Sequence, residues 1–244
     1  MEIKGKNVLI TGSAKRIGKY LALSLAKEGA NIIIHYNYSE KEAEDVVNQI
    51  KDLDVKVEKI KANLEDEKQV ISLAEESLNI FGKIDILINN ASIYYPTQLN
   101  ENISKISEEM DRFYKVHIKA PLILSTILGK HMFKKKEGRI INIGDYSPLR
   151  PYRNFTPYTI SKGGLLTLTK SLAKEFAPYV LVNAILPGPI IPPPDLEDKE
   201  TPLKKTLLKK WGGEKEILKA VKYLIETDFT TGAFIPVEGG RLLC

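Results

Sequence analysis

Tyr158 and Lys162 are the two side chains of this sequence whose types and spacing most clearly allow proton chemistry. Residues four apart in a helix lie on one face, one turn apart, so the ammonium of Lys162 would lie beside the phenol of Tyr158. A free phenol titrates near pH ~10, and a neighbouring cation lowers that value. The pair therefore predicts a group that transfers protons. The same spacing also arises on helices that have no catalytic part.

A turn containing glycine, residues 11–18, follows the first apolar segment of the chain. Glycines allow a tight turn there, and the next helix would present its N–H groups and positive dipole end to a pyrophosphate. The spacing of Gly12 and Gly18 is not that of the G-x-G-x-x-G fingerprint. Taken alone, the turn is therefore also consistent with a simple connection between a strand and a helix.

Apolar segments alternate with helical patterns along the whole chain. Strands are predicted at residues 8–10, 32–34, 55–60, 84–88, 140–143, 180–185 and 234–237. Helices are predicted from residue 17 to a stop at Gly29, and over residues 39–53, 66–81, 105–133 with a bend at Pro121, and 158–177. This alternation predicts an α/β fold, a single Rossmann-type doubly wound parallel sheet with helices on both faces. Residues 1–244 are expected to form one domain.

Polar residues and residues typical of turns follow the predicted strands. In parallel sheets, ligands bind beyond the carboxyl ends of the strands. One rim of the sheet should therefore hold the residues that come just after strand ends, which are Gly12, His35, Asn63, Asn90, Asp145 and Pro187.

The end of the second strand distinguishes the two nicotinamide cofactors. A carboxylate there would bond the ribose 2′-hydroxyl, whereas basic and hydroxyl groups accommodate a 2′-phosphate. Residues 35–39 contain no carboxylate, and Lys15 and Arg16 lie in the nearby turn, so NADP(H) is favoured. Glu40 is assigned instead to the first turn of a helix. Ser39 is expected to begin that helix as the first residue of a capping box.

The bulk composition limits the classes of function. The chain has 244 residues, of which 43% are hydrophobic, enough for one sizeable core. It contains no signal-peptide pattern and no apolar stretch of about 18 residues, so neither secretion nor a membrane span is expected. The one cysteine, Cys244, and three scattered histidines predict no disulfide within the chain and no metal site. We expect a cytoplasmic enzyme.

The net charge of +5 raises the question of nucleic-acid binding. However, the lysines are interleaved with glutamates or lie on predicted helix faces, and no basic stripe rich in aromatic residues accompanies them. We therefore expect a solvated charged surface that favours an anionic ligand such as a phosphorylated cofactor, and no nucleic-acid partner.

Together these motifs resemble the short-chain dehydrogenase/reductase family over nearly the whole chain. The resemblance rests on residues 11–18, 89–91, 187–188 and 238–240 and on Tyr158-x-x-x-Lys162. It implies a homodimer or homotetramer in which Tyr158 exchanges the proton, while Lys162 lowers its pKa and binds the nicotinamide ribose. The cofactor contacts that it implies are Gly12, Lys15, Arg16, Ile17, Gly18, His35, Tyr38, Ser39, Asn63, Leu64, Asn90, Ala91, Ser92, Tyr158, Lys162, Pro187, Gly188 and Ile190.

Four details are similar to a narrower group, the pteridine reductases and bacterial dihydromonapterin reductases. Arg16 replaces the middle glycine of the cofactor turn. Residues 35–39 resemble the group's phosphate-binding segment, except that Tyr38 stands where the group has an arginine. Tyr94 takes the place of an aromatic residue that stacks on the pterin, and Asp145 that of the usual family serine. The resemblance implies NADPH-dependent reduction of a C=N bond, with Arg16, Tyr94, Asp145 and Tyr158 at the substrate.

Asp145 can give a proton to a pterin nitrogen only when its carboxyl is protonated. Burial would raise its pKa, whereas Lys162 and Arg16 would oppose that shift. A serine would suit a ketone oxyanion better, because it donates a hydrogen bond without any pKa shift. A carbonyl reductase of the 3-oxoacyl thioester type stays open as an alternative, as does a non-catalytic NADP-binding interaction protein.

Two further positions depart from the family pattern. His117 stands where the family has an asparagine that supports a water relay to the lysine, and it either joins such a relay or is simply buried. Asn63 replaces the aspartate that meets the adenine, and its amide oxygen can still accept a hydrogen bond from the adenine amino group. The prolines within residues 187–194 predict a stiffened loop beside the substrate.

Overall fold

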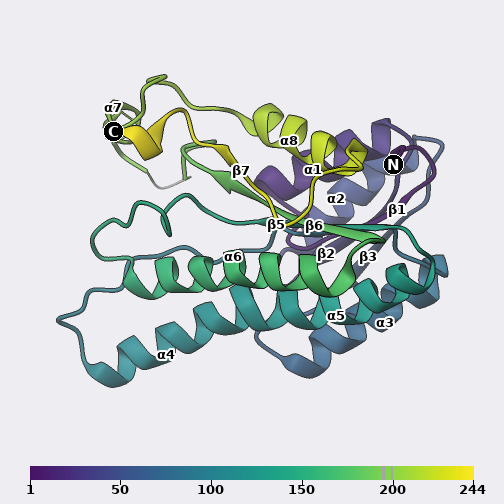
Figure 1. Cartoon of the computed structure of the whole chain (residues 1–244), viewed down its shortest axis with the longest axis horizontal. Helices are drawn as coiled ribbons and strands as arrows, with labels where there is room; N and C mark the ends of the chain where they lie inside the picture. Colours follow the sequence, from purple (N-terminus) through teal and green to yellow (C-terminus); the bar gives the residue numbers. More distant parts are fainter. Residues whose placement is uncertain (194–195, 199) are drawn as a thin grey trace.

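Seven parallel strands form one sheet in the order β3-β2-β1-β4-β5-β6-β7 (Figure 1). The computed structural model describes residues 1–193, 196–198 and 200–244, so Pro194 of the proline-rich loop lies outside the described residues. All seven predicted strands are present: β1 Asn7–Ile10, β2 Asn31–Tyr36, β3 Val57–Lys61, β4 Ile86–Asn89, β5 Gly138–Ile143, β6 Val180–Pro187 and β7 Phe234–Val237.

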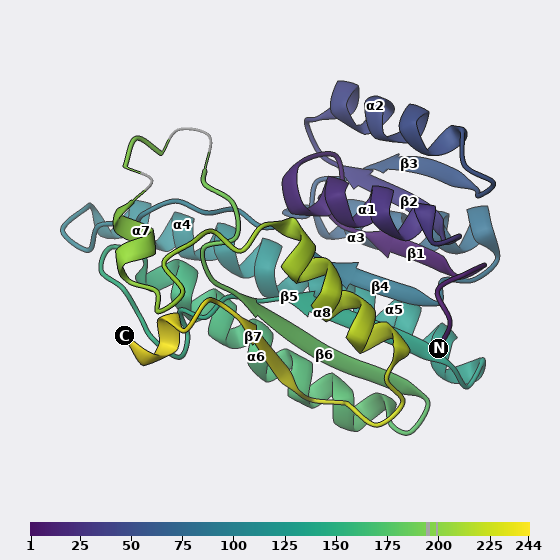
Figure 2. The same ribbon diagram turned by 90° about the horizontal axis from the view of Figure 1, so that it is seen from above.

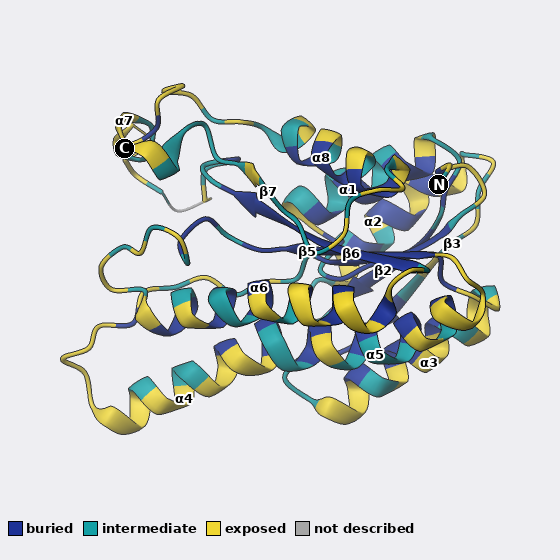
Figure 3. Ribbon diagram, viewed as in Figure 1, coloured by how far each residue is buried: buried dark blue, intermediate teal, exposed yellow. Residues whose placement is uncertain are grey.

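Helices cover both faces of the sheet, which confirms the doubly wound fold (Figures 1 and 2). One face packs against α1 Arg16–Lys27, α2 Glu40–Lys51 and α8 Glu214–Glu226, and the other against α3 Glu67–Phe81, α5 Ala120–Lys134 and α6 Thr156–Phe176. The central strands are buried on both faces (Figure 3), as their unbroken apolar sequences predict. None of the described helices is long and apolar enough to cross a bilayer.

The long helix predicted over residues 105–133 is divided in the structure. It consists of α4 Ile103–Tyr114, a π-helical turn Lys115–Lys119, and α5. The N–H of Ala120 bonds the carbonyl of Lys115, five residues back. The irregularity therefore lies just before Pro121, which has no backbone N–H to donate to the preceding turn. Such π-turns are frequent at functional sites, and this one carries His117.

Three local predictions need correction. Ser39 precedes α2, but its side chain makes no capping hydrogen bond, so the expected capping box is wrong. The short helix α7 Thr201–Lys204 and the longer α8 were not predicted. The signal for α8 was present, because its buried residues recur at helical spacing: Ile217, Ala220, Val221, Leu224 and Ile225.

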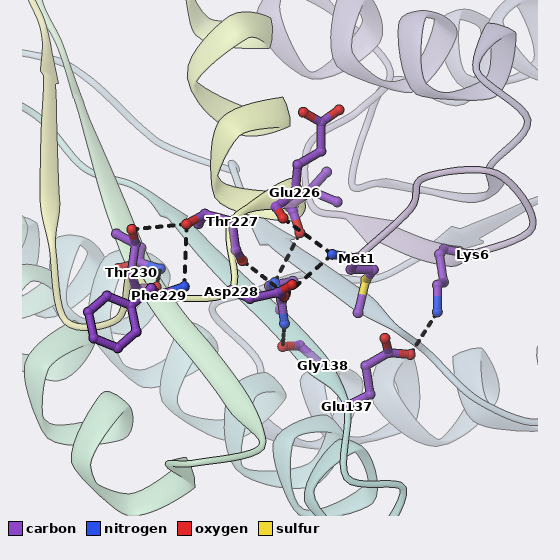
Figure 4. Close-up of polar contacts among 12 residues, drawn as sticks. Met1, Lys6, Glu137, Gly138, Glu226, Thr227, Asp228, Phe229 and Thr230 are labelled. Atoms are coloured by element: carbon purple, nitrogen blue, oxygen red, sulfur yellow. Dashed lines mark hydrogen bonds and ion pairs between the residues drawn. The ribbon is translucent and has the colours of Figure 1, made fainter.

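Polar contacts at the amino ends of the strands fix α8 to the sheet (Figure 4). The buried guanidinium of Arg139 donates to the carbonyls of Ile225 and Thr227 and to the carboxylate of Asp228. The ammonium of Met1 lies 3.5 Å from the same carboxylate. These contacts lie at the edge of the sheet opposite the carboxyl ends of the strands, so they leave the predicted ligand rim open.

Candidate active site

The turn between β1 and α1 is in close contact with the segment that follows β4. Gly12 has a φ of +64°, and a Cβ there would lie 3.0 Å from the Cα of Ala91. A Cβ on Gly18 would lie 2.2 Å from the carbonyl oxygen of Gly12. The amide of Asn90 donates to the carbonyls of Thr11 and Gly12. Only glycine fits at these two positions, and the backbone is left free to approach a ligand.

His35 supports this turn from inside the protein. The N–H of Gly12 donates to its Nδ1 at 2.9 Å. Its Nε2 lies 3.0 Å from the carbonyl oxygen of Ala62, which only accepts, so the proton is on Nε2. Burial lowers the pKa of His35 to about 4, so the ring is neutral at pH 7. Both ring nitrogens thus bond to protein, although the side chain also lines the cleft.

A cleft of about 440 Å³ opens at the carboxyl ends of β1, β2 and β4. Twelve of the predicted cofactor residues line it: Gly12, Lys15, Arg16, Ile17, Gly18, His35, Tyr38, Asn63, Leu64, Asn90, Ala91 and Ser92. The other six predicted cofactor residues are not among its lining residues: Ser39, Tyr158, Lys162, Pro187, Gly188 and Ile190. Sequence reasoning missed five others, for which no motif gave a signal: Asn37, Glu65, Ile93, Arg112 and Val116.

No carboxylate from the end of β2 lines this cleft. Glu40 accepts a hydrogen bond from Tyr36 at 3.4 Å and lies 3.6 Å from Lys59. The ammonium of Lys15 pairs with Glu42 at 2.7 Å. The expectation that Glu40 belongs to the first turn of α2 is therefore confirmed. The end of β2 presents the hydroxyl of Tyr38 and no carboxylate to the cleft, which is consistent with a 2′-phosphate.

The far end of the cleft is closed by a pair of opposite charges. Glu65 accepts hydrogen bonds from Arg112, with Nη2 at 3.0 Å and Nε at 3.2 Å from its carboxylate. The amide oxygen of Asn63 already accepts from the backbone N–H of Glu65 at 3.0 Å. The same oxygen also accepts from the side-chain amide of Asn37 at 3.4 Å, so an adenine amino group would have to displace that donor.

Arg16 joins the cofactor turn to the segment after β6. It has a φ of +53°, a left-handed conformation that is strained for a residue with a side chain. Its guanidinium donates to the carbonyls of Ile191 and Pro192, both at 3.3 Å. The side chain that replaces the family glycine therefore bridges the mouth of the cleft.

Asp145 and Tyr158 are bonded to each other beside the cleft. The strand β5 ends two residues before Asp145, and Tyr158 lies in the first turn of α6. The phenol donates to Oδ2 of Asp145 at 2.9 Å, while Oδ1 accepts from the N–H of Ser147 at 2.7 Å. Lys162, one turn along α6, donates to the carbonyl of Ile143 at 3.1 Å. The structure thus brings the three predicted catalytic side chains into one buried group.

Burial determines the protonation of this group. It raises the pKa of Asp145, although the hydrogen bonds from Ser147 and the charge of Lys162 oppose the shift. It also raises the pKa of Tyr158 well above its usual value, and Asp145 adds to that rise. Burial lowers the pKa of Lys162 to about 8. The expected lowering of the phenol pKa by Lys162 is therefore wrong for this structure, because burial and, after it, the charge of Asp145 raise that pKa.

Aromatic rings surround the phenol of Tyr158. Tyr94 stacks on Phe155 with ring centroids 4.8 Å apart, and its ring meets that of Tyr158 edge-on at 5.0 Å. Tyr152 packs against Phe155 at 5.0 Å. Tyr94 remains 53% exposed. Sequence reasoning missed Phe155 and Tyr152, although the concentration of aromatic residues between Asp145 and Tyr158 was a usable signal.

Comparisons with known proteins agree with this geometry. A family model described as short chain dehydrogenase matches residues 6–201. The chain is 31% identical to L-rhamnose 1-dehydrogenase (NADP(+)) of Thermoplasma acidophilum, with 100% of this chain and 98% of the relative covered. It is also 31% identical to the 3-oxoacyl-[acyl-carrier-protein] reductase FabG of Thermotoga maritima, with both chains covered in full.

A solved structure is equally similar. FolM alternative dihydrofolate reductase 1 from Brucella canis, complexed with NADP, has a TM-score of 0.91 and 33% identity, and the match covers 100% of this chain and 97% of that one. The sheet order, the glycine turn and the Tyr158–Lys162 pair agree with the family match. The chain belongs to the short-chain dehydrogenase family.

Proposed function

We propose that this protein is an NADPH-dependent reductase of a C=N bond in a dihydropterin-type substrate. The observation that carries the proposal is the partly buried carboxyl of Asp145, 2.9 Å from the phenol oxygen of Tyr158. Loss of solvent raises the pKa of this carboxyl, and a carboxyl with a raised pKa is an acid suited to a ring nitrogen. The family's usual serine at this position would only donate a hydrogen bond to an oxyanion.

The residues of the cleft fit NADP(H). Its glycine turn offers backbone N–H groups at the start of α1 to a pyrophosphate. The ammonium of Lys162 is buried and bonds one carbonyl, that of Ile143. Its remaining N–H donors have no protein partner among the described residues, and ribose hydroxyls would satisfy them. When bound, NADPH supplies the hydride.

The proton comes from the chain's own residues. As the substrate carbon C6 accepts a hydride, the C6=N5 double bond becomes single and N5 takes a proton. The hydrogen-bonded pair of Tyr158 and Asp145 delivers that proton, directly or through a water. Burial raises the pKa values of both groups and so favours their protonated forms. Lys162 remains largely a cation there, since its pKa is lowered only to about 8.

The aromatic residues around Tyr158 support a flat, electron-poor substrate. Tyr94 and Phe155 are already stacked, and the edge of Tyr158 meets Tyr94. A pterin ring inserted between Tyr94 and the nicotinamide would continue this stack. The similarity to a dihydrofolate reductase of the same family adds support, because its substrate is also a reduced pterin.

The second candidate is reduction of a 3-oxoacyl thioester. The 31% identity to a 3-oxoacyl-[acyl-carrier-protein] reductase over the full chain favours it. Asp145 argues against it, because an ionised carboxylate would repel the developing oxyanion and a protonated one is not needed there. A third outcome, cofactor binding without turnover, would indicate an interaction protein.

The test is NADPH oxidation by the purified protein with dihydropterins, an acetoacetyl thioester and an activated ketone in parallel. Turnover of the dihydropterins in preference to the other two supports the proposal. Preference for the thioester supports the second candidate. Tight NADPH binding with no turnover of any substrate would remove the enzymatic account.

We further propose that residues 1–244 act as one NADP-binding unit, since strands from Asn7 to Val237 share one sheet. We expect a homodimer or homotetramer, as the family commonly forms. The single cysteine suits a reducing compartment such as the cytoplasm. Light scattering and cell fractionation test these two expectations.

A further inference from the structure

His117 connects two parts of the active site that are distant in sequence. It lies in the π-helical turn between α4 and α5 and is 1% exposed. Its Nε2 is 2.9 Å from Oγ of Ser92 and 3.2 Å from the backbone nitrogen of Ile93, just before Tyr94. Its Nδ1 is 2.8 Å from Oγ of Ser161 on α6. The ring therefore spans the gap between the loop after β4 and the helix that carries the catalytic phenol.

The hydrogen bonds determine which ring nitrogen carries the proton. The backbone N–H of Ile93 can only donate, so Nε2 must accept. Ser161 donates its own hydroxyl proton to the carbonyl of Tyr158 at 2.6 Å, so its oxygen must accept from Nδ1. The ring is thus the neutral Nδ1–H tautomer, and every polar position on it is occupied by protein.

We propose that His117 is a positioning residue. Its neutral imidazole fixes the Tyr94 loop to the Tyr158 helix and neither gains nor loses a proton during turnover. The connection on the Nε2 side ends one residue before Tyr94. The connection on the Nδ1 side passes through Ser161 to the backbone of Tyr158. The ring also packs edge-on against Tyr158 at 5.6 Å and beside Phe113 at 5.7 Å.

The surroundings oppose a proton-carrying role. Burial, and after it the nearby charge of Lys162, lower the pKa of His117 well below its usual value. The groups packed against the ring are Tyr158, Ser161 and Lys162 of α6, Ser92 of the loop and Phe113 of α4, and none supplies a negative charge. A cationic imidazole would also lose its bond from Ile93, because Nε2–H cannot accept.

The direct test is nitrogen NMR of the protein labelled in its histidine rings. The chain has three histidines, and His35 serves as an internal reference of the opposite tautomer, Nε2–H. We expect His117 to show the Nδ1–H pattern unchanged between pH 6 and 8. An Nε2–H pattern, or titration within that range, would overturn the proposal. This readout requires no substrate, so it is independent of whether the substrate is a pterin.

The kinetic test separates the two sides of the ring. In place of His117, the side-chain amide of asparagine reaches the position of Nδ1. The amide of glutamine, one carbon longer, reaches the position of Nε2. His117→Gln keeps the loop contact and loses the one to Ser161, so kcat should fall about tenfold with KM little changed, the scale of one buried hydrogen bond. His117→Asn keeps the contact to Ser161 and loses the loop, so KM should rise about tenfold with kcat little changed.

Partner-side variants and a control complete the design, and any substrate that the enzyme turns over can be used. Ser161→Ala should reproduce the kcat loss of His117→Gln. This expectation rests on the proposed function only because it takes Tyr158 to exchange the proton. His131→Asn, the same change in the neighbouring helix α5, should leave both constants unchanged. Equal kcat losses in both His117 variants, together with a changed solvent isotope effect, would indicate a proton relay and contradict the proposal.

Discussion

Replacing Asp145 by asparagine preserves the shape of the side chain but removes its acidic proton. The amide oxygen can take the place of Oδ1 and still accept from the N–H of Ser147, which now donates at 2.7 Å. The amide NH2 then takes the place of Oδ2, which now accepts from Tyr158 at 2.9 Å, and the phenol oxygen must accept instead of donating. The fold should be retained, because the N–H of Ser147 keeps its acceptor and the phenol hydroxyl can rotate to accept. General acid catalysis contributes about 10²–10⁴-fold, or roughly 3–5 kcal/mol of the barrier, so kcat for a dihydropterin should fall by at least 10²-fold.

The pH dependence of kcat provides a second readout of the same change. Burial raises the pKa of Asp145, and only the protonated carboxyl is a donor. Activity should therefore be complete below that pKa and should fall as pH rises through it. Asp145→Asn has no carboxyl to titrate, so this limb of the profile should disappear.

Asp145→Ser discriminates between the two candidate reactions. Serine restores the family's usual hydrogen-bond donor, which suits a developing oxyanion but supplies no acid for a ring nitrogen. Dihydropterin turnover should fall, while turnover of an activated ketone should be maintained or should improve. Asp54→Asn, at an exposed position remote from the site, is the matched control and should change neither reaction. If Asp145→Asn and Asp145→Ser both left dihydropterin turnover and its pH profile unchanged, Asp145 would be only a loop residue.

Four further outcomes are expected. The enzyme should prefer NADPH to NADH at least tenfold in kcat/KM, about 1.4 kcal/mol, and equal efficiencies would contradict the reasoning about the end of β2. Tyr158→Phe should lower kcat by ~10²-fold or more while NADPH binding, measured by fluorescence, persists; a near-normal rate would remove the phenol from the mechanism. Tyr94→Ala should weaken pterin binding by roughly 1–3 kcal/mol and Tyr94→Phe far less, whereas equal affinities would argue against stacking. Because the folded pKa of His35 is about 4 and the unfolded value about 6.5, stability should fall as pH drops from 6.5 toward 4, by up to ~1.4 kcal/mol per unit, and His35→Asn should reduce that slope in urea titrations.

The order and type of most elements were predictable because most strands contain a run of apolar residues bounded by a turn, although β3, with the sequence VEKIK, alternates. Such an apolar run is required of strands that are buried on both faces, as β1, β5 and β6 are. The division of the long helix was not predictable. Its π-turn depends on one extra residue in the hydrogen-bond ladder, and Pro121 indicated an irregularity nearby but not its type.

The site residues that belong to a sequence motif were predictable. The contacts between charged residues that are distant in sequence were not. The proximity of Asp145, Tyr158 and Lys162 followed from helical spacing and strand order. The pKa of Tyr158 was predicted with the wrong sign, because burial and the adjacent carboxyl outweigh the ammonium. The Arg112–Glu65 pair at the far end of the cleft joins segments 47 residues apart, so no local pattern indicated it.

The fate of the hydride tests the central claim most directly. The enzyme is given NADPH deuterated at the transferable position, together with equal concentrations of a dihydropterin and an acetoacetyl thioester, and both products are analysed by mass spectrometry. The account predicts one deuterium at C6 of the tetrahydropterin and little in the hydroxyacyl product. Deuterium found only in the hydroxyacyl product would contradict it and would establish the carbonyl-reductase alternative.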